Sequence, residues 1–171
     1  MSDGGGIEQR LAALRIVVFD VDGVLTDGSV SVDAQGGETL RFDVQDGLGI
    51  VRGRQVGLEF AIISGREAPA VTARARRLGI EHVQQGQFDK SEAIARVLAD
   101  LAVDLSAVAF MGDDLNDLPA MERVGVVCAP SNARPEVKEV ADLVTVAAGG
   151  RGAVREFLER IIAAKGRTGA P

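Results

Sequence analysis

The sequence predicts a three-layer α/β fold in which helices cover both faces of a mainly parallel, doubly wound, Rossmann-like sheet. Short apolar runs of strand character alternate along the chain with longer segments of helical periodicity. Polar residues directly follow several of these runs, as expected where the carboxyl ends of parallel strands carry a binding site. The chain has 171 residues, of which 46% are hydrophobic, which is enough for one domain with a substantial core.

Local patterns place the individual elements in order. Alternating residues on either side of a turn at 34–37 predict a β-hairpin. Proline suits a first helical turn, glycine suits a helix end, and aspartate suits a helix cap. The predicted strands are 15–19, 28–33, 38–44, 58–63, 80–83, 107–111, 124–129 and 143–146. The predicted helices begin near Asp46, Pro69, Lys90, Pro119, Pro135 and Gly152.

Composition limits the partners of the protein and the compartment in which it acts. The net charge of −6 argues against binding nucleic acid, which requires a basic face. No apolar run reaches membrane-spanning length, and the first residues lack a signal-peptide pattern. The single cysteine, Cys128, lies in an apolar run and is expected to be buried. We therefore expect a cytoplasmic protein with no membrane partner. Its domain should span 11–165, between a flexible lead-in at 1–10 and a disordered tail at 166–171.

Two carboxylates mark the end of the first predicted strand. Asp20 and Asp22 lie two residues apart, which places them on the same side of an extended segment. Such close like charges are unfavourable unless a cation or a shared proton offsets them. Gly23 allows the backbone to turn sharply beside them. Carboxylates in this setting suit a hard cation and nucleophilic attack on phosphorus, although paired acids are also common in exposed turns.

Three further polar motifs follow along the chain. Ser64 comes directly after the strand at 58–63, Lys90 begins a predicted helix, and Asp113-Asp114 follows the strand at 107–111. Individually, the serine is explained by turn chemistry and the lysine by a solvated helix start. Together, Asp, Ser, Lys and Asp-Asp in this order resemble the haloacid dehalogenase (HAD) superfamily of phosphatases.

That resemblance implies a role for each motif. Asp20 would attack phosphorus, and Asp22 would protonate the leaving oxygen and then activate water. Ser64 and Lys90 would hold the phosphoryl group. The cofactor would be Mg²⁺, bound by Asp20, the Asp22 carbonyl and Asp113, with Asp114 and Asp117 orienting those ligands. The resemblance also implies that the first strand lies between those at 58–63 and 107–111.

The spacing of the motifs leaves no room for a cap domain. The stretch from 21 to 63 holds the hairpin and one helix, and that from 65 to 89 holds a helix and a short strand. A site without a cap must take a large substrate or borrow a lid from a neighbouring subunit.

Longer segments narrow the resemblance to phosphatases of 3-deoxy-D-manno-octulosonate 8-phosphate (KDO 8-phosphate). It covers about residues 12–165 and is strongest at 20–28, 42–47, 64–66, 85–90, 112–119 and 149–156. That family supplies KDO for lipopolysaccharide as a magnesium-dependent homotetramer, in which hairpins meet at the interface and C-terminal segments can close neighbouring sites. The implied substrate is a phosphorylated sugar acid, contacted by Asp22, Asp43, Val44, Gln45, Asp46, Gly47, Arg66, Arg74 and Lys90.

Two departures and two alternatives accompany this interpretation. Val51 stands where the family often has arginine, and Asp43 where asparagine is usual. A nine-carbon sugar-acid phosphate such as KDN 9-phosphate is the nearest rival substrate, although its phosphatases tend to have glutamate at the position of Arg66. The other alternative is a non-catalytic HAD-like oligomerisation module. The intact acidic and lysine motifs argue against it.

Overall fold

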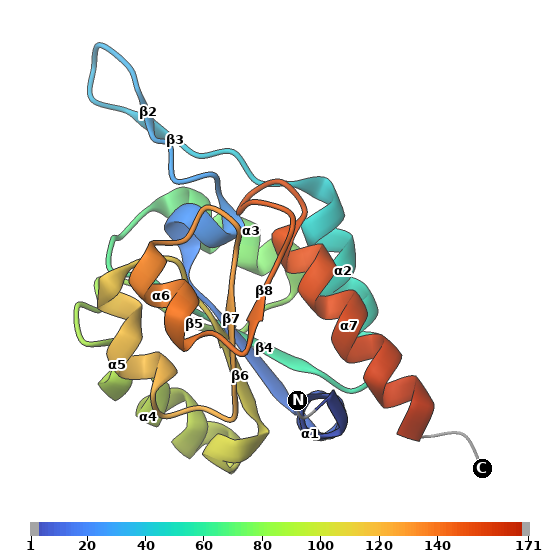
Figure 1. Ribbon diagram of the computed structural model, residues 1–171. Coiled ribbons are helices and arrows are strands. Elements are labelled where there is room, and N and C mark those ends of the chain that lie inside the picture. Colours follow the sequence, from blue (N-terminus) through green and yellow to red (C-terminus); the bar gives the residue numbers. More distant parts are fainter. Residues whose placement is uncertain (1–3, 169–171) are drawn as a thin grey trace.

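The computed structural model describes residues 4–168, which fold around a six-stranded parallel sheet (Figure 1). The strand order is β5-β4-β1-β6-β7-β8. As expected, the first strand lies between its two predicted neighbours, since Phe19 pairs with Ile62 on one side and Met111 on the other. The strands are β1 (Ile16–Phe19), β4 (Glu59–Ile63), β5 (His82–Gln84), β6 (Val108–Met111), β7 (Val126–Ala129) and β8 (Leu143–Val144).

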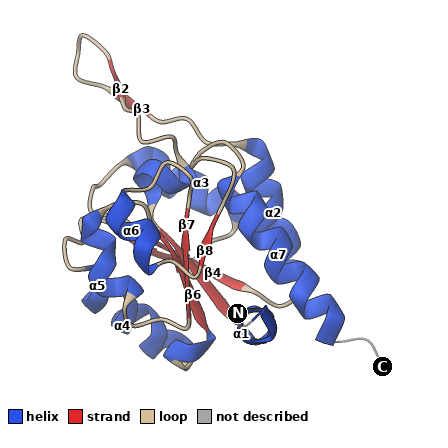
Figure 2. Ribbon diagram, viewed as in Figure 1, coloured by secondary structure: helices blue, strands red, loops and turns tan. Residues whose placement is uncertain are grey.

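Helices cover both faces of the sheet (Figure 2). Val17 and Phe19 of β1 belong to one core with Phe157, and Ile16 and Val18 belong to a second core on the opposite face. This alternation along one buried strand creates the three layers that the sequence predicts. The first face carries α1 (Gly4–Ala13), α2 (Val44–Gln55), α3 (Pro69–Leu78) and α7 (Ala153–Thr168), and the second carries α4 (Lys90–Leu101), α5 (Leu118–Met121) and α6 (Pro135–Val140).

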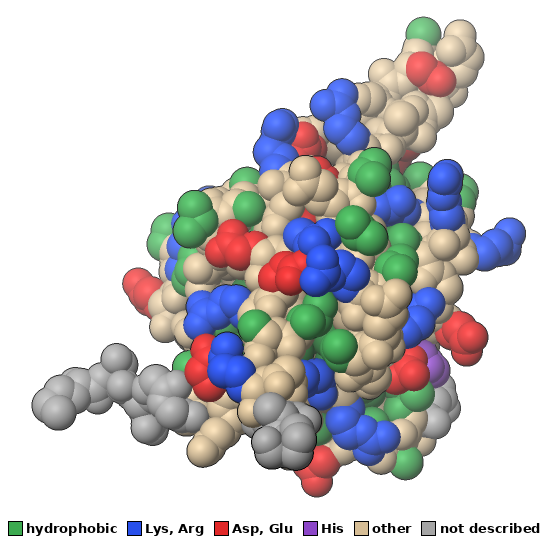
Figure 3. All heavy atoms as spheres, turned by 90° about the vertical axis from the view of Figure 1, so that its right-hand side faces the viewer, with side chains coloured by type: hydrophobic (Ala, Val, Ile, Leu, Met, Phe, Trp, Pro, Cys, Tyr) green, Lys and Arg blue, Asp and Glu red, His purple; other side chains and the backbone are tan. Residues whose placement is uncertain are grey.

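The hairpin is shorter than predicted and projects from the body of the molecule (Figures 1 and 3). Its strands, β2 (Ser31–Val32) and β3 (Glu38–Thr39), are joined by two residue pairs, and all four residues are exposed. Leu40 and Phe42 instead pack against the core at its base. The hairpin and α2 fill the chain between β1 and β4, so this stretch contains no cap domain, as predicted.

Both ends of the described chain are more helical than expected. The predicted flexible lead-in is largely the helix α1, which packs on α7 through Leu11 and pairs Glu8 with Arg160 at 3.5 Å. The predicted tail is helical as far as Thr168, and residues 1–3 and 169–171 lie outside the described residues. Among those described, no helix is long and apolar enough to span a membrane.

The start of α2 also differs from the prediction. Asp43, not Asp46, caps this helix, because its Oδ1 accepts hydrogen bonds from the backbone N–H of Gln45 at 2.6 Å and of Asp46 at 3.0 Å. Both aspartates are plausible caps from sequence alone. The structure uses the earlier one because the carboxylate of Asp46 is directed into the protein, as described below.

Candidate active site

The loops that follow β1 and β6 lie against each other at the carboxyl end of the sheet. Backbone hydrogen bonding continues past the strands, since the N–H of Asp20 donates to the carbonyl of Met111 at 3.0 Å. Gly23 turns the first loop with φ of +88°. A Cβ at this position would lie 2.0 Å from Oδ2 of Asp113, so only glycine allows the two loops to approach this closely.

Lys90 joins the two acidic loops from inside the protein. Its Nζ donates to Oδ1 of Asp20 and to Oδ1 of Asp117, both at 2.5 Å. The lysine side chain is only 1% exposed. Burial alone would lower the pKa of Lys90, but the two carboxylates raise it above its ordinary value. The lysine is therefore a buried ammonium that neutralises part of an acidic cluster, rather than a solvated helix start.

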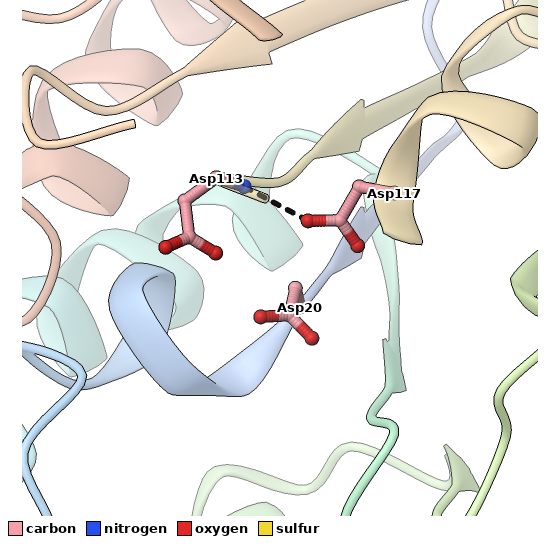
Figure 4. A group of neighbouring side chains, drawn as sticks. All are labelled: Asp20, Asp113 and Asp117. Carbon is pink, nitrogen blue, oxygen red and sulfur yellow. Dashed lines mark hydrogen bonds between the residues drawn. The ribbon is translucent and has the colours of Figure 1, made fainter. Parts of the chain in front are cut away.

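Asp117 fastens the second acidic loop. While its Oδ1 accepts from Lys90, its Oδ2 accepts from the backbone N–H of Asp113 at 2.9 Å and of Asp114 at 3.2 Å (Figure 4). Both carboxylate oxygens are thus engaged within the protein. The carboxylate of Asp113 differs, because its Oδ1 is buried and has no hydrogen-bond partner among the described residues.

The cluster has the composition of a site for a hard divalent cation. Asp20, Asp113 and Asp117 each offer an oxygen, and these oxygens lie within 4.8 Å of one another. Burial, with Asp20 and Asp117 close by, raises the pKa of Asp113 to about 8, and burial also raises the pKa of Asp20. One lysine cannot balance three carboxylates, whereas a divalent cation could. Because Asp117 is already engaged, Asp20 and Asp113 are the better-placed ligands, and oxygen ligands suit Mg²⁺.

A small cavity opens above this cluster. It encloses about 190 Å³ and is lined by Asp20, Asp22, Gly65, Arg66, Asp113, Asp114 and Asn116. A larger hollow of about 700 Å³ beside the start of α3 is lined by Glu67, Ala68, Pro69, Thr72, Ala73, Arg76 and Gln85. The larger hollow has a single carboxylate and one arginine, whereas the smaller cavity has four carboxylates and one arginine. The smaller cavity is therefore the better candidate for a catalytic site.

Arg66 forms one wall of the small cavity. Its Nε donates to Oδ2 of Asp22 at 2.9 Å, and this hydrogen bond raises the pKa of the guanidinium further. Ser64 precedes it and is 2% exposed. The Oγ of Ser64 accepts from the N–H of Arg66 at 3.2 Å, which is turn chemistry, and Ser64 is not among the residues that line the cavity.

The predicted substrate contacts at 43–47 do not line this cavity. Asp43 caps α2, and its carbonyl accepts from Nη2 of Arg74 at 2.7 Å. Val44 and Gln45 are exposed to solvent. Gly47 packs against Arg74, since a Cβ at this position would lie 2.6 Å from Nη2. Within one chain, these residues form a group that is separate from the cavity lining.

Asp46, which we predicted to contact substrate, is directed into the protein and does not line this cavity. It is 2% exposed. Its Oδ1 accepts from the N–H of Arg155 at 2.8 Å, and its Oδ2 from that of Gly152 at 3.4 Å. Burial raises its pKa to about 6. Asp46 therefore caps the start of α7 from a neighbouring helix and holds the preceding loop in place.

Two residues at or near the site were not singled out by the sequence analysis. Asn116 lines the cavity, and its place within the acidic motif was the available signal. Asn132 links two loops, because its Nδ2 donates to the carbonyl of Gly23 at 3.0 Å and its Oδ1 accepts from Gly149 at 2.6 Å. It lies in an ordinary Ser-Asn-Ala turn, and no spacing marks it.

Comparison with known proteins agrees with this geometry. Residues 79–158 match the haloacid dehalogenase-like hydrolase family. The chain is 44% identical to the 3-deoxy-D-manno-octulosonate 8-phosphate phosphatase of Escherichia coli K12, over 90% of this chain and 82% of that one. The crystal structure of the corresponding phosphatase from Yersinia pestis superimposes with a TM-score of 0.92 at 42% identity, covering 95% of this chain and 88% of that one.

A third relative carries ligands. The phosphatase from Moraxella catarrhalis, crystallised with magnesium, phosphate and KDO, has a TM-score of 0.93 and 40% identity, over 96% of this chain and 94% of that one. The parallel sheet with acidic loops at its carboxyl end defines a HAD-like hydrolase. Given the identity and coverage, the chain belongs to the KDO 8-phosphate phosphatase family within that class.

Proposed function

We propose that the protein hydrolyses KDO 8-phosphate to KDO and inorganic phosphate, with Mg²⁺ bound between the two acidic loops. The observation that carries the proposal is the buried Asp20–Lys90–Asp117 group beside the unpaired Oδ1 of Asp113. This arrangement lies in a chain 40% identical to a phosphatase that binds magnesium, phosphate and KDO. A buried, partly compensated acidic site is expected where chemistry takes place.

Asp20 is proposed as the nucleophile. Lys90 engages its Oδ1, which leaves Oδ2 free to attack phosphorus. The attack forms a P–O bond to Asp20 and breaks the bond from phosphorus to the sugar oxygen. Asp22 would give that departing oxygen a proton carried on its Oδ1, the carboxyl oxygen that does not accept from Arg66. In the second step, Asp22 removes a proton from the water that hydrolyses the aspartyl-phosphate.

The other residues hold the reacting groups and offset their charge. Lys90 and the hydroxyl of Ser64 would donate to the phosphoryl oxygens, as positioning and neutralisation are the main requirements of phosphoryl transfer. Asp20, the Asp22 carbonyl and Asp113 would hold the Mg²⁺, which neutralises charge on the phosphoryl group when bound. Asp114 and Asp117 would orient the loop that carries Asp113.

The active form is proposed to be a homotetramer in the cytoplasm. Val32 on the projecting hairpin is 63% exposed, and a two-stranded hairpin is marginal on its own. Packing hairpins from several copies together would bury this surface. The same assembly would bring Asp43, Val44 and Gln45 of one copy to the open site of another, where they could contact substrate.

Phosphate release from a panel of sugar-acid phosphates tests this function. We expect KDO 8-phosphate to be hydrolysed with the highest kcat/KM, EDTA to abolish the reaction and Mg²⁺ to restore it. A preference for KDN 9-phosphate would select the nine-carbon alternative. A protein that releases no phosphate from either acid or from p-nitrophenyl phosphate with Mg²⁺ would be a non-catalytic module, and the proposal would be wrong.

A further inference from the structure

Arg66 faces two carboxylates of its own chain. Its Nε donates to Oδ2 of Asp22 at 2.9 Å. Its two terminal nitrogens face Glu38 of the hairpin, with Nη1 3.5 Å from Oε1 and Nη2 3.4 Å from Oε2. A guanidinium holds a carboxylate through its fork of N–H groups, along either the Nε side or the terminal pair. Both sides of Arg66 are therefore already turned to an internal carboxylate.

The two contacts differ in strength. The contact with Asp22 has the length of a good charge-assisted hydrogen bond and lies at the site cavity. The contact with Glu38 is long, and the side chains of Arg66 and Glu38 are 40% and 42% exposed. The Nη2 atom itself is buried and has no hydrogen-bond partner among the described residues. Exposed ion pairs of this kind contribute little, so Glu38 is the partner that can be displaced.

We propose that the carboxylate of the substrate replaces Glu38 on Arg66, so that Glu38 occupies the carboxylate subsite of the ligand-free protein. This inference rests on the proposed function, which supplies a substrate with a carboxylate. The exchange keeps one negative charge on the terminal nitrogens of Arg66 and leaves the Asp22 contact in place. Glu38 thereby lowers the apparent affinity for sugar acids, while a phosphate ester without a carboxylate is unaffected by it.

Replacing Glu38 with a neutral residue measures this competition. In Glu38→Gln, we expect the KM for KDO 8-phosphate to fall by about 2- to 5-fold with kcat unchanged, as for loss of one exposed ion pair. Calorimetric titration with KDO alone should show a dissociation constant lowered by the same factor. The KM for p-nitrophenyl phosphate should not change. Glu38→Ala should behave like Glu38→Gln.

A matched control separates this effect from net charge. Glu81 is an exposed carboxylate just before β5, at the end of the sheet opposite the site, so Glu81→Gln makes the same charge change elsewhere. The inference is overturned if KM for KDO 8-phosphate rises or stays constant in Glu38→Gln. It is also overturned if p-nitrophenyl phosphate or the Glu81→Gln control shows the same decrease. Failure of the proposed function would appear differently, as an unmodified protein that hydrolyses p-nitrophenyl phosphate but neither hydrolyses nor binds the sugar acid.

Discussion

The acidic loops and the hairpin leave the same end of the molecule but are built in opposite ways. The loop after β1 is fixed by the Asp20–Met111 backbone bond, by Lys90 and by Asn132. The hairpin is held by two residue pairs and projects into solvent. Residues that take part in a chemical step require fixed geometry. A surface that binds a substrate or another subunit can be less stable locally until its partner is bound. We therefore propose that the buried loops carry out the chemistry and that the exposed hairpin contributes to selectivity and assembly.

The charged side chains of the two regions also differ in how far they are exposed to solvent. Lys90 and Asp117 are essentially inaccessible to water, and removal of Lys90 would leave both Asp117 and Asp20 without their cation. The side chains of Arg66 and Glu38 are 40% and 42% exposed, so removal of Glu38 should have a small effect on stability. Loss of the buried lysine should thus affect both stability and turnover, whereas substitutions in the hairpin should affect binding or assembly.

Replacing the nucleophile should have the largest effect. Asp20→Asn retains the size of the side chain and its hydrogen bond with Lys90 but removes the attacking charge. We expect kcat to fall by about 10³-fold or more, with the circular dichroism spectrum unchanged. Phosphate release in the presence of Mg²⁺ gives the rate, and mass spectrometry checks for deamidation back to aspartate. Near wild-type activity in variant protein whose introduced asparagine is intact would contradict the mechanism.

Removing the buried lysine should reduce stability as well as activity. Lys90→Met fills similar space but leaves Asp20 and Asp117 facing each other without a cation. We expect a loss of about 3–5 kcal/mol in the free energy of unfolding without metal, measured in urea. An exposed pair offers a control, because Arg96→Met, which removes a 3.7 Å contact with Glu92 and an exposed hydrogen bond to Gln87, should cost less than about 1 kcal/mol. Equal losses in the two variants would show that burial of the Lys90 cluster does not increase its contribution to stability.

Charging the hairpin should separate assembly from folding. Val32→Asp places a carboxylate on a surface that we expect other copies to cover, and it should dissociate the tetramer while changing monomer stability by no more than about 0.5 kcal/mol. Light scattering reports the mass. Gln35→Asp adds the same charge at the exposed hairpin turn and should leave the mass unchanged. A monomeric unmodified protein that is fully active on KDO 8-phosphate would refute the proposed assembly.

A further prediction concerns the pH dependence of stability at Asp46. Burial raises its pKa from 3.8 to about 6, so the folded protein binds this proton more tightly than the unfolded chain. Its contribution to stability is therefore greatest below pH 3.8 and is lost as pH rises towards 6. Asp46→Asn cannot titrate, so the stability of this variant relative to wild type should increase across that interval. Urea unfolding at several pH values measures the difference, and a constant difference would contradict this assignment.

Much of the fold could be predicted because local and tertiary preferences agree. Pro69 and Gly79 bound α3 as the sequence indicates, and Asp89 caps α4 through the N–H of Ser91 at 3.0 Å. The predicted start of α2 was wrong because Asp43 and Asp46, three residues apart, are both suitable helix caps. Helix α1 was missed because its glycines disfavour a helix, and packing on α7 decides the outcome.

Several residues of the site could be predicted from the sequence, but the contacts between them could not. Motif order brought Asp20, Lys90 and Asp113 together, whereas their catalytic roles stay predictions. Order along the chain cannot reveal that Lys90 also pairs with Asp117, or that Glu38 faces Arg66, because both contacts depend on the packing of distant segments. The inward direction of Asp46 likewise follows from the position of α7.

The most direct test of the assigned chemistry is to find the phosphate on the enzyme during turnover. Protein mixed with Mg²⁺ and KDO 8-phosphate would be quenched in acid, digested and analysed by mass spectrometry. We predict a phosphorylated peptide carrying the modification at Asp20, absent from Asp20→Asn and from samples treated with EDTA. Rapid phosphate release without any phosphorylated Asp20, or with the phosphate on another residue, would contradict the account.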